Sequence, residues 1–119
     1  MIRLTEVTYD SARPIDGYGP GFFRIGGEVL RGAVLVTATA AKGWGGFDDR
    51  APLLALVGEI DVLLLGTGRT IAHPPASLRD ALEAAGIGVE PMDSAAAART
   101  YNVLLSEGRR IAAALLPVE

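Results

Sequence analysis

The chain has 119 residues, of which 50% are hydrophobic and 21% are charged; its formal net charge is −3 and it has no cysteine. These values are typical of a globular domain, and they exclude disulfides, thiolate nucleophiles and cysteine-bound metals. The acidic balance argues against nucleic acid as a partner, and no apolar run reaches the ~20 residues of a membrane span. Glu6 and Asp10 interrupt the region where a signal peptide would be apolar. We expect a single domain over residues 1–119, a cytoplasmic location and no membrane insertion.

The first twenty residues carry weak structural signals. A period-two alternation over residues 2–7 predicts a first strand. Residues 14–21 are dense in glycine and proline and predict a loop.

A hairpin follows. Residues 22–25 contain two phenylalanines and an isoleucine, which suit a strand. Gly26-Gly27 supplies the positive φ angles of a two-residue turn. Residues 28–39 predict a longer returning strand, with a bend at Gly32.

The middle of the chain predicts a loop and a short helix. Residues 42–47 form a glycine-rich loop that contains a tryptophan. Asp48 or Asp49 is placed to cap a helix with Pro52 in its first turn, and Gly58 ends it.

The second half alternates between strands and helices. The apolar run 61–65, which ends in Gly66, predicts a strand that is buried on both faces, as in a parallel sheet. Pro74 and Pro75 open a helix with apolar residues at 78, 81, 82 and 85, and Gly86 follows it. Residues 87–92 predict a strand, Asp93 or Ser94 caps a last helix that ends at Gly108, and residues 110–118 predict a final strand.

This order predicts an α/β fold. We expect a three-layer single domain with a central mixed β-sheet, helices on its faces and an N-terminal antiparallel β-hairpin.

The turn Gly66-Thr67-Gly68 resembles a nucleotide-binding loop only in part. A dinucleotide fingerprint has a third glycine three residues later, where this chain has Ile71, and a P-loop ends in Gly-Lys-Ser/Thr, which is absent. Two interpretations remain. Its backbone N–H groups and Arg69 bind a small anion, or the segment is a purely structural turn.

Catalytic and metal chemistry find little support in the sequence. His73 is the only histidine and has no companion ligand at metal spacing, so we expect a loop or helix-entry residue and no metal site. N-capping accounts for Asp48, Asp49 and Asp93 without acid–base catalysis. We predict no catalytic residue and no cofactor.

Aromatic and polar clusters supply two further candidates. Trp44 and Phe47 either anchor a partner protein or cover a sheet edge. In the last helix, Arg99, Thr100 and Asn102 surround the inward-facing Tyr101, and helix propensity gives no reason for Thr100 and Asn102.

Four segments resemble a known family: GYGPGFFRIGGEV, DVLLLGTG, LRDALEAAGIGVEPMD and ARTYNVLLSEGRRIAAALLPV. They look like the DUF498/DUF598 family of unknown activity, which includes a mitochondrial complex I assembly factor and an adipogenesis-associated human protein. The resemblance runs from Gly17 to Val118 and implies a three-layer fold with a mixed sheet. It carries over no catalytic residue. Relatives often have a cysteine at the position of Ala98 and a threonine at that of Ser94.

Two hypotheses follow from these observations. In the first, the chain is a non-enzymatic interaction or assembly protein related to respiratory-complex assembly, with a protein partner contacting the Trp44–Phe47 loop and a sheet edge. In the second, it is a small-anion or metabolite-binding protein, or an enzyme, that uses a cleft at the strand ends, where residues 66–69 and 93–102 meet. The candidate ligand residues are Gly66, Thr67, Gly68, Arg69, Asp93, Arg99, Thr100 and Asn102. A homo-oligomer formed through an edge strand stays open.

Overall fold

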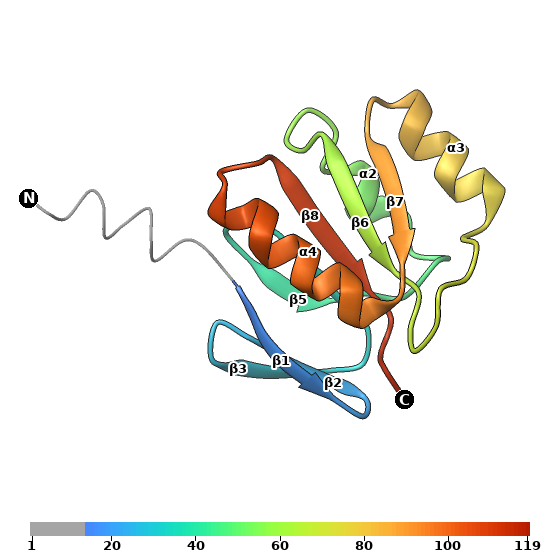
Figure 1. The fold of residues 1–119 in the computed structure, drawn as a ribbon. Helices are drawn as coiled ribbons and strands as arrows, with labels where there is room; N and C mark the ends of the chain where they lie inside the picture. Colours follow the sequence, from blue (N-terminus) through green and yellow to red (C-terminus); the bar gives the residue numbers. More distant parts are fainter. Residues whose placement is uncertain (1–13) are drawn as a thin grey trace, which may run out of the picture.

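The computed structural model describes residues 14–119, so the strand expected over residues 2–7 lies outside the described part of the chain. The described residues form two β-sheets and three helices (Figure 1). This is the mixed α/β architecture that the sequence predicts.

A small antiparallel sheet comes first. It has the order β1-β2-β3, with β1 at Ile15–Gly19, β2 at Phe22–Ile25 and β3 at Glu28–Arg31. The loop predicted over residues 14–21 is therefore wrong, because β1 occupies most of it and pairs with β2 through a bulge between Ile15 and Gly17. Pairing and the burial of Ile15 outweigh the poor strand propensity of the glycines.

The hairpin between β2 and β3 forms as predicted. Gly26 and Gly27 have φ angles of 57° and 89°, the left-handed values that a two-residue hairpin turn requires. The single strand predicted over residues 28–39 is wrong. At Gly32, where φ is 83°, the chain leaves the small sheet, and β4 (Val34–Val36) belongs to the second sheet.

The second sheet has five strands in the order β5-β4-β8-β6-β7. β6 (Val62–Gly66) pairs in parallel with both β7 (Gly88–Met92) and β8 (Ile111–Leu115). β4 is antiparallel to β8 and to β5 (Ala41–Gly43), which takes part of the loop predicted over residues 42–47. All five residues of β8 are buried, as expected for a central strand covered on both faces.

Two hydrophobic clusters lie on opposite faces of this sheet. On one face, α4 (Ser94–Ser106) and the small sheet contribute Tyr101, Phe23 and Ile25, which are fully buried. On the other face, α2 (Ala51–Leu54), α3 (Ala76–Ala84) and the loop at Trp44 cover the sheet. Figure 1 shows α4 in front of the sheet and α2 behind it.

The helix caps were predicted with mixed success. Asp93 caps α4 by accepting a hydrogen bond from the backbone N–H of Ala96 at 2.8 Å. The capping of α2 by Asp48 or Asp49 is wrong: its N-cap residue is Arg50, and no side chain caps it. The Asp49 carboxylate instead accepts from the N–H of Gly45 at 2.9 Å, within the loop.

Candidate functional site

The turn after β6 packs tightly against the start of α4. A Cβ atom added at Gly66 would lie 2.7 Å from Ser94 Oγ and from a methyl group of Leu115. Only a glycine permits this approach, because no real side chain tolerates such contacts. Gly68 has a φ of 100°, which an L side chain adopts only with strain. Both glycines are therefore required by the fold.

Ser94 joins three segments at this end of the sheet. Its hydroxyl accepts from the Gly68 N–H at 2.8 Å and donates to the Leu116 carbonyl at 2.6 Å, and its own N–H donates to the Gly68 carbonyl at 2.8 Å. The side chain is fully buried, so these bonds replace its lost hydration. The sequence indicated Ser94 only as a cap, because its partners lie more than twenty residues away in the chain.

The polar groups of the turn after β6 form hydrogen bonds with other groups of the chain. The Thr67 N–H donates to the Met92 carbonyl at 2.9 Å, and the Thr67 hydroxyl donates to the Thr70 carbonyl at 2.8 Å and accepts from the Ala72 N–H at 2.9 Å. The N–H groups of Thr67 and Gly68 are thus engaged with the protein itself. Arg69 lies exposed on the same loop, and within residues 14–119 it makes no ion pair.

The remaining candidate ligand residues do not all meet at this turn. Asp93 does, since it precedes Ser94. Asn102 lies eight residues further along α4, roughly 12 Å of helix, where its side chain accepts from the N–H of Ile15 and donates to the Ile15 carbonyl, both at 2.8 Å. Arg99 is exposed and Thr100 is half-buried on the same helix. The structure therefore groups Gly66–Gly68 with Asp93, and uses Asn102 to fasten β1 to α4.

Trp44 is buried and does not project from the surface. It is 6% exposed, its indole N–H donates to the Asp49 carbonyl at 3.0 Å, and its ring meets that of the half-buried Phe47 edge-on, with centroids 6.2 Å apart. Of the two arrangements that the sequence allowed, this is the one in which the pair covers the sheet.

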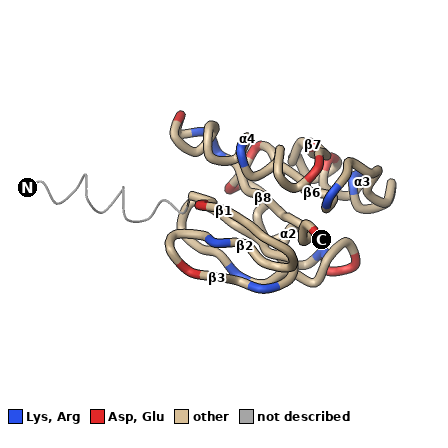
Figure 2. Tube along the Cα trace, turned by 60° about the horizontal axis from the view of Figure 1, so that its bottom comes forward, with Lys and Arg blue, Asp and Glu red and all other residues tan. Residues whose placement is uncertain are grey.

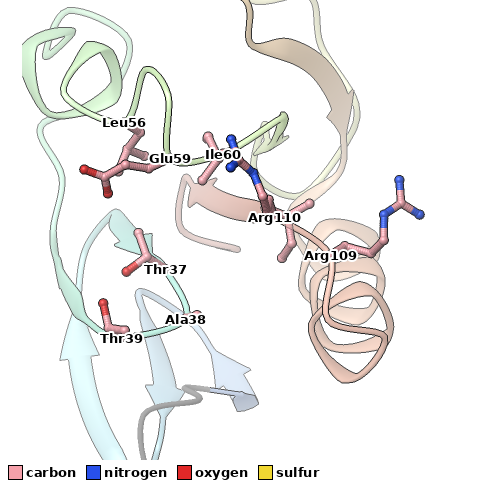
Figure 3. Close-up of a pocket in the computed structure, with 9 residues that line it drawn as sticks. Thr37, Ala38, Thr39, Leu56, Glu59, Ile60, Arg109 and Arg110 are labelled. Atoms are coloured by element: carbon pink, nitrogen blue, oxygen red, sulfur yellow. The ribbon is translucent and has the colours of Figure 1, made fainter. Parts of the chain in front are cut away.

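A concave region of about 240 Å³ lies at the opposite end of the parallel strands, where β6 and β8 begin (Figure 3). Arg110 lines it but is already engaged: its guanidinium donates to the Gly58 carbonyl at 3.0 Å and lies 3.4 Å from the Asp61 carboxylate. Arg109 points away from the other lining residues (Figure 3). The other lining residues are Thr37, Ala38, Thr39, Leu56, Glu59, Ile60 and Ile111.

One polar atom in the core stands out. The hydroxyl of the fully buried Tyr101 has no hydrogen-bond partner among residues 14–119. Desolvation by this burial raises the pKa of the phenol above its ordinary value.

The described residues contain neither a metal-binding cluster nor a membrane-spanning helix. Within residues 14–119, no group of three or more His, Asp or Glu side chains is arranged to hold a metal ion. Over the same residues no helix is long and apolar enough to cross a membrane.

Comparison with known proteins places the chain in a family. Residues 15–116 match the family model described as "Protein of unknown function (DUF498/DUF598)", and the chain belongs to this family. An uncharacterized protein of Rhodobacter capsulatus is 60% identical over 113 residues, which cover 95% of this chain and 91% of that protein.

Two further relatives carry descriptive names. The zebrafish (Danio rerio) protein named NADH dehydrogenase (ubiquinone) 1 alpha subcomplex assembly factor 3 is 34% identical, over 98% of this chain and 71% of its own length. A solved structure described as an outer membrane protein from Bartonella henselae has a TM-score of 0.84 and 36% identity, covering 92% of this chain and 98% of that one. The resemblance and the fold class expected from the sequence are both confirmed.

Proposed function

We propose that this chain is a non-enzymatic protein that binds other proteins during assembly of a respiratory complex. The observation that carries the proposal is its 34% identity to a protein named as a complex I assembly factor, over 98% of the chain. The candidate site is consistent with it, since Ser94, Thr67 and Asn102 direct their polar atoms to the backbone of the chain itself. We also propose a cytoplasmic location, which cell fractionation tests directly.

Removal of the gene from its host tests this function. We expect less fully assembled complex I on native gels and lower NADH:ubiquinone oxidoreductase activity, both restored by the wild-type gene. The tagged full-length chain should capture complex I subunits, identified by mass spectrometry. Normal assembly in the deletion strain, together with no captured complex I subunit, would contradict the proposal.

Trp44→Ala is a poor test of binding. Because Trp44 is buried and packed, its loss would destabilise the fold by about 3 kcal/mol or more, and any loss of binding would follow from unfolding. Surface substitutions are required instead.

A small-anion or metabolite-binding function is the alternative. One observation favours it: Arg69 is exposed beside the left-handed turn at Gly68, at the carboxyl end of β6. Thermal-shift measurements with phosphate, nucleotides and small carboxylic acids test it. A rise in melting temperature that Arg69→Ala abolishes would support this alternative, whereas no rise with any of these compounds would contradict it.

A further inference from the structure

The outward face of the small sheet carries four neighbouring side chains. The register pairs Phe22 with Arg31 and Arg24 with Val29 across β2 and β3. Directly opposed residues of an antiparallel pair share a face, and neighbouring residues along a strand alternate between faces. Phe23 is fully buried, so its neighbours Phe22 and Arg24 point outward. We call Phe22, Arg24, Val29 and Arg31 the basic face.

This face is flat on the side of β1. Gly17 and Gly19 oppose Arg24 and Phe22, and neither contributes a side chain. A Cβ atom added at Gly19 would collide with the ring of Phe22, so that ring lies over the backbone of β1, whereas the space above Gly17 is open. A flat surface suits an extended or flat protein partner more than an enclosed small molecule.

The two arginines of the basic face are not paired with an acid of the described chain. Arg24 and Arg31 are exposed, and within residues 14–119 neither makes an ion pair. Two acids lie on these strands: the Asp16 carboxylate accepts from the Gly27 N–H at 2.8 Å and keeps its charge, and Glu28 pairs in register with the inward-facing Ile25. Figure 2 shows basic positions along β2 and β3, with an acidic position beside them in β1.

Apolar groups accompany these charges. Val29 is 46% exposed and Phe22 is half-buried. Arginine beside an aromatic residue is a combination enriched at protein interfaces. We propose that the basic face docks an acidic surface of a protein partner, whose carboxylates pair with Arg24 and Arg31 and whose apolar groups cover Phe22 and Val29. The inference rests on the proposed assembly function and names the surface that performs it.

Other occupants fit less well. Two arginines release few counterions, which is too few for tight binding to a nucleic acid or an anionic membrane. A second copy of the chain, docked face to face about a two-fold axis, would bring four arginines together, and these like charges would repel one another.

The first test needs no known partner. The isotope-labelled full chain is titrated, with amide resonances as the readout, with a short glutamate-rich peptide that has valine at alternate positions and with a matched lysine peptide. We expect shifts centred on residues 22–24 and 29–31 with the acidic peptide alone, weakened by salt. Equal shifts with both peptides, shifts centred elsewhere, or binding of an RNA oligonucleotide or phosphatidylglycerol vesicles in place of the acidic peptide would overturn the proposal.

The second test uses purified complex I subunits and two charge-reversed variants. Arg24→Glu with Arg31→Glu alters the basic face, while Lys42→Glu with Arg109→Glu makes the same charge change at two other exposed positions. We expect the first variant to bind at least about ten-fold more weakly and the second to bind within about two-fold of wild type.

Different results would refute the assembly function and the role of the basic face. If both variants bind as wild type does, the assembly function stands and the basic face is refuted. If wild type binds no complex I subunit yet still shows the acidic-peptide shifts, the basic face stands and the proposed function is refuted for complex I. Circular dichroism of both variants verifies that they are folded.

Discussion

At the scale of single residues, Tyr101 and Gly66 show opposite demands on the core. The Tyr101 ring fills the space between α4 and the sheets, while its hydroxyl lies without a described partner. Gly66 has no side chain because Ser94 and Leu115 already occupy that space. Tyr101 therefore buries a hydroxyl that no described group bonds to, whereas at position 66 only glycine fits.

Tyr101→Phe should therefore keep or increase stability. An unpartnered buried hydroxyl costs about 1–3 kcal/mol, and we expect the variant to gain about 1 kcal/mol in the free energy of unfolding at neutral pH, measured with urea. A loss of that size would show instead that the hydroxyl has a partner, such as a bound water.

The same variant changes the response to alkali. The pKa of Tyr101 in the folded chain lies above the value of about 10 that it has when unfolded. This pKa difference leaves the free energy of unfolding unchanged below pH ~10. It lowers the free energy of unfolding as the pH rises further, because only the unfolded state then releases the phenol proton. Unfolding measured across this range should show a steeper alkaline loss for wild type than for Tyr101→Phe. Identical slopes would contradict the assignment.

Gly66→Ala should be destabilising by about 2–3 kcal/mol, because the added carbon would lie 2.9 Å from the Ser94 Cα, a backbone atom that cannot easily move. Gly43→Ala is the matched control, since a Cβ there meets no atom within 4 Å. We expect the control to remain within about 0.5 kcal/mol of wild type. Equal effects of the two substitutions in thermal unfolding would mean that close packing at Gly66 is unimportant.

At the scale of elements, side-chain bonds between distant segments hold the layers together. Asn102 ties α4 to β1, and Ser94 ties α4 to the turn after β6 and to the segment after β8. Arg79 donates to the Val89 carbonyl at 3.3 Å and so connects α3 to β7. α4 is thus bonded to both sheets.

Asn102→Ala should loosen β1. Both polar groups of the Ile15 backbone lose their partner, which we expect to cost about 2 kcal/mol. Val103→Ala, at a 55% exposed position on the same helix, should change stability by less than about 0.5 kcal/mol. Amide hydrogen exchange should accelerate most in β1 of the Asn102 variant. Unchanged protection of β1 would contradict the role given to this asparagine.

The elements also show which signals a sequence carries. Gly26-Gly27, the apolar run before Gly66 and the cap at Asp93 were predicted correctly because each signal is local. β1 was missed because its strand state depends on pairing with β2, which its glycines do not indicate. The partners of Ser94 and Asn102 could not be predicted either, since hydrogen bonds to residues 22 to 87 positions away leave no local pattern.

At the scale of the whole molecule, the two sheets share one core. Phe23 and Ile25 of the small sheet pack in the same cluster as Leu64 and Ala113 of the large one. The last residues add a second connection: Leu116 donates to the Gly66 carbonyl at 2.9 Å, and the Val118 carbonyl accepts from Gly21 at 3.2 Å. The small sheet has no separate core among the described residues.

We therefore predict that the chain unfolds in a single cooperative transition, as a one-domain protein does. Trp44, the only tryptophan, reports by fluorescence on the cluster beneath α2 and α3, whereas far-ultraviolet circular dichroism reports on all elements. The two signals should give coincident midpoints in urea. Amide exchange provides the stricter measurement: Phe23 and Leu64 should open with the same free energy, because neither side of their shared cluster can be exposed alone. Exchange of Phe23 through an opening of lower free energy would show instead that the small sheet detaches by itself, and the basic face would then belong to a mobile element.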